Sequence, residues 1–145
     1  MGKSFDRIGG LLEKIAKSRR PVLDECAETK YMAVQNPEGA QHTYMQLLRT
    51  NLLSSDVLDS AKSTCPDEIE KLDKLAKGNR IKQGLVSTLQ SLRSRYLDTV
   101  LRPAVKQYIN GNKESERDVE RLYDSALLLD ELLEIGHFIE RVAGV

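Results

Sequence analysis

Apolar residues recur every three or four positions in the last third of the chain, and this spacing constrains the fold more than any other feature. The series runs through Val119, Leu122, Ala126, Leu129 and Leu133. Residues three and four apart lie on one side of an α-helix, so the series predicts a long core helix over about 116–134. Further apolar residues widen the seam beyond that of a two-stranded coiled coil: Tyr123, Leu127, Leu128 and Leu132. We therefore expect this helix at the centre of the core, contacted from two sides.

A second long apolar series precedes the first and predicts another helix, over about 79–109. Its members are Ile81, Leu85, Leu89, Leu92, Tyr96 and Val100. Pro103 follows within the same stretch, and a proline ring clashes with the preceding helical turn, so we expect a kink there. The Asn-Gly-Asn sequence of residues 110–112 then predicts the break between the two long helices.

The remaining segments also carry helical signals. Amphipathic spacing predicts a helix over residues 1–20 and a shorter one up to the Asn36-Pro37 pair, followed by a turn at residues 38–39. A third helix is expected to break near Ser54, and a fourth to run over 66–77 before Gly78 ends it. No stretch alternates as a β-strand does, and no internal repeat is visible. The sequence thus predicts one all-α domain, 1–145, a helical bundle of about five or six helices.

Composition and charge exclude several classes of function. The chain has 22 Lys and Arg against 22 Asp and Glu, so no overall charge attracts nucleic acid. It has only two cysteines and no secretion signal, which indicates reduced thiols in a cytoplasmic protein. No apolar run approaches the length of about 20 residues that spans a bilayer.

Two residue patterns suggest catalysis, and neither is complete. Glu134 and His137 are three apart on a predicted helix and could share a metal ion, but a carboxylate-bridged di-iron site needs a second such pair. Cys65 precedes a helix start that would favour a thiolate, but Asp67 and Glu68 follow it and oppose that charge. We therefore expect no enzyme activity, no metal and no cofactor.

The predicted first helix is basic and amphipathic. Residues 1–20 hold six cations against two acids, whereas residues 113–141 hold four cations against nine acids. This helix could pack against the acidic last helix, bind a partner, or lie on an anionic membrane. Its candidate binding residues are the apolar Phe5, Ile8, Leu11, Leu12 and Ile15 and the basic Lys14, Lys17, Arg19 and Arg20.

A second group of cations lies on the predicted kinked helix and the turn before it. The turn over residues 78–84 combines glycines, cations and a helix start, which is the chemistry of an anion cradle, although it lacks the pattern of a P-loop. Candidate anion-binding residues of this group are Arg80, Lys82, Arg95, Arg102 and Lys106. Such cations also suggest nucleic-acid binding. We do not favour this alternative, because no nucleic-acid-binding motif accompanies them.

These observations favour a non-catalytic protein–protein interaction or scaffold module. Because the apolar seam of the last helix needs more cover than short helices supply, we expect self-association into a homo-oligomer or binding of another protein. The leading alternative is a peripheral membrane protein that docks through its first helix.

Overall fold

The chain folds into an all-α bundle, as the sequence predicts. The computed structural model describes the backbone of residues 2–54, 56–112 and 116–144 and the side chains of residues 9–54, 58–112 and 116–144. Its elements are α1 (Gly2–Ser18), α2 (Arg20–Gln35), α3 (Pro37–Leu48), η1 (Arg49–Leu53), η2 (Asp56–Ala61), α4 (Pro66–Leu75), α5 (Leu85–Tyr96), η3 (Leu97–Leu101), α6 (Arg102–Ile109) and α7 (Glu116–Ala143). η1 and η3 are π-helical turns, and η2 is a 3-10 helix. This part of the chain contains no β-strand.

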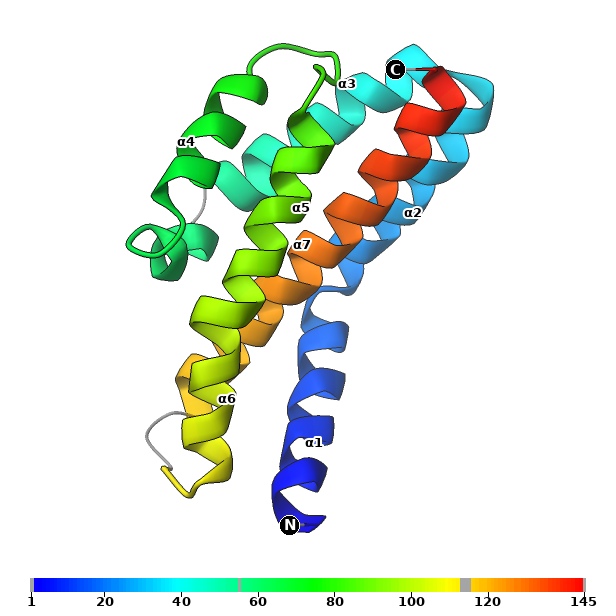
Figure 1. Ribbon diagram of the computed structural model, residues 1–145. Helices are drawn as coiled ribbons and strands as arrows, with labels where there is room; N and C mark the ends of the chain where they lie inside the picture. Colours follow the sequence, from blue (N-terminus) through cyan, green and yellow to red (C-terminus); the bar gives the residue numbers. More distant parts are fainter. Residues whose placement is uncertain (1, 55, 113–115, 145) are drawn as a thin grey trace.

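Helix α7 runs through the middle of the bundle (Figure 1). α1 and α2 follow one another along one side of it and point the same way. α5, η3 and α6 form one continuous rod that runs antiparallel to α7, while α3 crosses its upper part and α4 packs on the outer side of α5. α1, α2, α3, α5 and α6 all contact α7, which confirms the central place predicted for it.

The predicted long helix exists, but it begins later than the sequence indicates and carries a π turn ahead of Pro103. It starts at Leu85 rather than near residue 79, because Gly84 takes a left-handed conformation with φ of 90°. Ile81 lies in the loop before it, where its backbone N–H donates to the side chain of Gln41 at 3.1 Å. Ahead of Pro103, η3 widens the helix into a π turn, which moves the Thr99 carbonyl out of the way of the proline ring.

The last helix is longer than predicted and ends at Ala143 rather than near residue 134. Gly136 lies inside it, although glycine has a low intrinsic helix propensity. At this point α7 approaches α3 and α5 so closely that a Cβ on Gly136 would lie 2.7 Å from the hydroxyl of Tyr44 and 3.0 Å from Val86. The glycine therefore belongs to the packing of the core, which outweighs its low helix propensity.

The predicted turn at residues 38–39 is wrong, because both residues lie in the first turn of α3. Asn36 caps that helix, and its side chain accepts a hydrogen bond from the backbone N–H of Gly39 at 3.0 Å. Pro37 occupies the first helical position, where a missing N–H costs nothing. The predicted break near Ser54 is confirmed, since η1 ends at Leu53 and η2 begins at Asp56.

Two apolar clusters hold the bundle together. The large one joins α2, α3, α5 and most of α7, with fully buried members such as Tyr44, Leu48, Leu89, Leu129 and Leu132. The small one consists of Leu11 from α1, Tyr108 from α6 and Val119 from α7, with Ala104, Val105 and Tyr123 packed against it. Among the described side chains, fewer buried ones cover the lower part of α7 in Figure 1 than its upper part.

Candidate functional site

The pair that suggested a metal site does not act as a pair. The Glu134 carboxylate bonds to the ammonium group of Lys30 at 3.3 Å, and the His137 ring faces Glu140 at 3.8 Å. Among the described residues, no three His, Cys, Asp or Glu side chains lie close enough together to hold a metal ion. The two groups are therefore engaged in separate surface contacts.

Both cysteines are buried free thiols. Burial raises the pKa of the Cys26 thiol to about 12, with smaller contributions from the negative charges of Glu131 and Glu25. Cys65 precedes α4, as predicted, and lies 3.5 Å from the hydroxyl of Thr64. Cys26 thus stays protonated at neutral pH, which does not suit a nucleophile.

The described part of the predicted membrane-binding face packs largely against the bundle. Ile15 and Leu11 are only 3% and 8% exposed, whereas Leu12 is 43% exposed. Leu11 belongs to the small apolar cluster. Phe5 and Ile8 lie outside the residues whose side chains are described.

The four candidate cations at the end of α1 and the start of α2 divide into two that bind α7 and two that face solvent. Lys14 pairs with Glu120 at 3.2 Å, and the Arg19 guanidinium donates two hydrogen bonds to the carboxylate of Asp124. These contacts fit the sequence-based alternative in which the basic first helix packs against the acidic last one. Lys17 and Arg20 are exposed.

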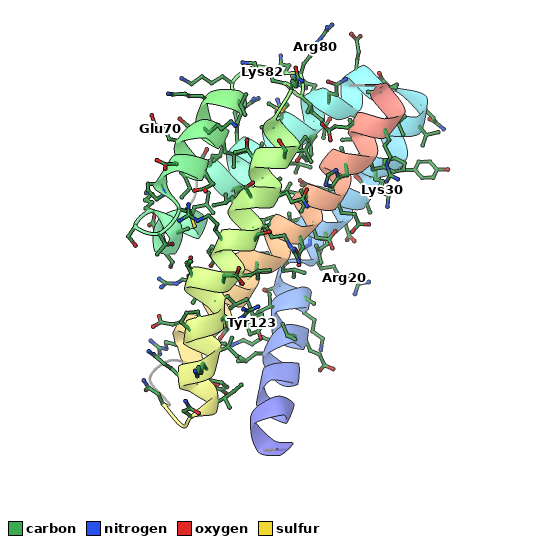
Figure 2. All side chains as sticks on the ribbon, viewed as in Figure 1. Arg20, Lys30, Glu70, Arg80, Lys82 and Tyr123 are labelled. Atoms are coloured by element: carbon green, nitrogen blue, oxygen red, sulfur yellow. The ribbon has the colours of Figure 1, made fainter. Side chains whose placement is uncertain are left out.

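The structure does not bring the predicted anion-binding residues into one site. Figure 2 places Arg80 and Lys82 at the upper end of the bundle, whereas Arg102 and Lys106 lie on α6 at the opposite end. Arg80 pairs with Glu38 at 2.8 Å. Arg95, between the two ends, bonds to the carboxylate of Glu68 at 2.8 Å and to the carbonyl of Thr64 at 2.9 Å.

The pairing of Arg95 also sets the ionisation of its partner. The hydrogen bond from Arg95 lowers the pKa of the Glu68 carboxyl group. Glu68 thus stays charged at neutral pH, and the ion pair ties α4 to α5 rather than offering Arg95 to an anion.

Arg102 and Lys106 instead border an apolar groove that the sequence did not reveal. The groove has a volume of about 480 Å³, and its apolar lining consists of Leu97, Leu101, Val105, Ile109 and Tyr123. We call this feature the η3–α6 groove. Its first four lining residues are spaced four apart along one face of the rod, and Tyr123 of α7 forms the facing wall. The four-residue spacing was the signal in the sequence that could have revealed this row. The spacing alone does not show which face of the helix is left uncovered by neighbouring helices.

A second exposed apolar surface lies at the other end of the bundle, on the last turns of α2. Tyr31 is 76% exposed and Val34 is 66% exposed, and Met32 beside them is also open to solvent. The residues of this surface all belong to one helix, whereas the η3–α6 groove is a hollow lined by the η3–α6 rod and by α7. A hollow between two elements is the shape that buries most of a bound side chain, so the η3–α6 groove is the stronger candidate site.

Comparisons with models of known protein families, with curated proteins and with solved structures each gave no match. Within the described residues, no helix is both long enough and apolar enough to cross a lipid bilayer. The function must therefore be argued from the surface of the bundle itself.

Proposed function

We propose that this chain is a non-catalytic protein-interaction module that binds another polypeptide in the η3–α6 groove. The observation that carries the proposal is the groove itself: four apolar side chains in a row, an aromatic wall, and two cations at the rim. Grooves of this kind accept one face of a helix in known recognition modes. An apolar centre with a charged rim is also the usual composition of an interaction site.

The sequence argument for self-association is weaker than the argument for a partner. It depended on α7 lacking cover, but five other helices contact α7 and its apolar seam is largely buried. A second copy is thus not needed to complete the core. The groove is open in a single chain, so binding of a different protein requires no second copy of this chain.

Photo-crosslinking would test the proposal. A photoreactive amino acid at Ile109, which is 39% exposed in the groove, should crosslink to a distinct polypeptide in extract from the native source. The matched control places the same group at the exposed Lys77, beyond the end of α4 and away from the groove. Equal crosslinking at both positions, or none at Ile109, would argue against the groove as the binding site.

The membrane alternative can be tested in the same preparation. If α1 docks on lipid, the full chain should bind vesicles that contain anionic lipid, and Leu12→Glu should abolish that binding without unfolding the half-exposed site. Ile15→Glu places a charge at a buried position and should unfold the region instead. We expect no vesicle binding by the parent chain, because Leu11 and Ile15 are already buried in the bundle.

A further inference from the structure

We propose that the partner segment bound in the η3–α6 groove is an acidic amphipathic helix of a different protein. The inference rests on the proposed function and adds the chemistry of the partner. Three observations support it: the shape of the apolar row, the charges at its rim, and the lack of a suitable acidic helix in the described part of this chain.

The apolar row has the length and spacing of a helix-binding site. From Leu97 to Ile109 the rod advances about 18 Å, at about 1.5 Å per residue. A partner helix of about twelve residues spans the same length and presents apolar side chains at every third or fourth position. Tyr123 forms a facing aromatic wall, and aromatic residues commonly dominate the binding energy of an interface.

The groove walls are anchored in the protein. Val105 and Tyr123 line the groove and also pack against the small apolar cluster of Leu11, Tyr108 and Val119. Because packing against this cluster already restricts the conformations of both side chains, they lose little conformational entropy when a partner binds. This lowers the entropy cost of association.

The charges at the rim are positive and available. Lys106 has no ion-pair partner within the described residues. Arg102 pairs with Asp98 one turn earlier at 3.3 Å, but both side chains are more than 60% exposed, and such surface pairs contribute little. Among the described residues, no acidic side chain lines the groove itself, and Asp98 lies beside its rim in the pair with Arg102. Acids beside the apolar face of a partner helix would therefore meet two cations along the groove.

The described part of the chain offers no helix of its own that fits this description. α4 carries acids such as Asp67 and Glu70 on its outer side, but its Leu72 is fully buried in the core. α7 is acidic in its first turn, but its apolar seam is likewise buried. Exposing either face would require the bundle to open, so the acidic helix is assigned to another protein.

Peptide binding to the full chain tests the inference directly. The probe is a fluorescent helical peptide of about 16 residues with leucines at positions i, i+4, i+7 and i+11 and glutamates beside them. A matched peptide carries lysines in place of the glutamates. We expect the acidic peptide to bind at least tenfold more tightly at low salt, and the difference to shrink at high salt as the charges are screened.

A charge reversal on the protein should reverse the preference. Arg102→Glu combined with Lys106→Glu should favour the lysine peptide, because both positions are exposed and the fold need not change. The control combines Lys77→Glu with Lys82→Glu, two exposed positions away from the groove, and should leave both affinities unchanged. Circular dichroism checks that each variant stays folded.

The outcomes separate the two proposals. Tighter binding of the lysine peptide to the parent chain, reduced by Ile109→Ser, would overturn the acidic partner while leaving the groove as a docking site. If neither peptide binds, or if Ile109→Ser changes nothing, both proposals fail. If the chain dimerises in light scattering and Ile109→Ser abolishes the dimer, the occupant is a second copy and the inference of a different protein is wrong.

Discussion

The upper half of the bundle, where α2, α3 and α5 surround α7, is held differently from the lower half, where α1 and α6 flank it (Figure 1). In the upper half, buried polar groups bond across helices: the Tyr44 hydroxyl donates to the carbonyl of Leu132 at 2.9 Å. In the lower half, the described side chains of α1 and α6 that are buried are Leu11, Ile15 and Tyr108, and the Tyr108 hydroxyl has no hydrogen-bond partner among the described residues. Two ion pairs add to this contact, one from Lys14 of α1 to Glu120 and one from Arg19, directly after α1, to Asp124.

This difference indicates that the upper half maintains the fold, whereas the lower half is available to bind a partner. A region with many buried contacts opens only with global unfolding, whereas a region with few can open locally. The η3–α6 groove lies at the lower half, next to the small cluster. The candidate binding surface thus lies in the half of the molecule that has fewer described buried contacts.

The sharpest test of the comparison is the same truncation made in both halves. Leu129→Ala removes a fully buried side chain of the large cluster and should lower the free energy of unfolding by about 3–4 kcal/mol. Leu11→Ala, in the small cluster, should cost about 1–2 kcal/mol, because its neighbours can close on the space. Urea titration followed by circular dichroism measures both. Equal losses would show that the two halves are equally cohesive.

The close approach at Gly136 offers a second test within the upper half. Gly136→Ala should lower the free energy of unfolding by about 2–3 kcal/mol, because the added methyl group would lie 2.7 Å from the Tyr44 hydroxyl. In a Tyr44→Phe background the same substitution should cost less, since the oxygen atom is gone. A double-mutant cycle isolates this coupling. Gly10→Ala, where the space is open, is the control and should not destabilise.

A third test concerns the attachment of α1. Asp124→Asn removes the negative charge that binds Arg19, so α1 should detach more readily. We expect amide exchange in α1 to accelerate about tenfold, equivalent to about 1.4 kcal/mol, while exchange in α3 stays unchanged. Added salt should accelerate α1 exchange in the parent and have less effect on the variant. Uniform acceleration throughout the bundle would contradict a separable lower half.

The smallest effect on stability is expected from the carboxyl group of Glu131, which lies next to α2. Burial raises the pKa of the Glu131 carboxyl, helped by the charges of Glu134 and Asp130. An acid whose pKa is raised on folding destabilises the fold as pH rises from below its unfolded pKa, about 4.3, through the folded value. Glu131→Gln should therefore raise the melting temperature by about 1–2 °C at pH 7 and by less at pH 4. The control Glu13→Gln, at an exposed position of α1, should leave the melting temperature at pH 7 nearly unchanged.

The sequence predicts which segments are helical because helical periodicity is a local property. The spacing of Leu85, Leu89 and Leu92, and of Val119, Leu122 and Ala126, requires no knowledge of the rest of the chain. One of the boundaries that were wrong also involves a distant partner. Ile81, which precedes the left-handed Gly84 and lies outside the helix, donates its backbone N–H to Gln41, 40 residues away in the sequence. Local patterns contain no information about such contacts.

The candidate site was predictable only in part, for a similar reason. The sequence identified Arg102 and Lys106 as a local excess of cations, and the structure keeps them together on α6. It also grouped them with Arg80 and Lys82, from which the length of the rod separates them. The groove beside them depends on Tyr123 of another helix, and on the side of the rod that α7 leaves open.

The π turn η3 keeps the two ends of the rod in register although it holds an extra residue. A π turn holds one more residue than an α-helical turn, so every side chain after it is rotated by about 100° relative to an unbroken helix of the same residues. Deleting a single residue from 97–101 would let the rod continue as a plain α-helix and keep Val105 and Tyr108 on the side that faces α7. Inserting a residue, or straightening the turn with all its residues present, would rotate both side chains away. Substitutions at the exposed Asp98 or Thr99 leave the register intact. The segment should therefore accept the loss of one residue more readily than the gain of one.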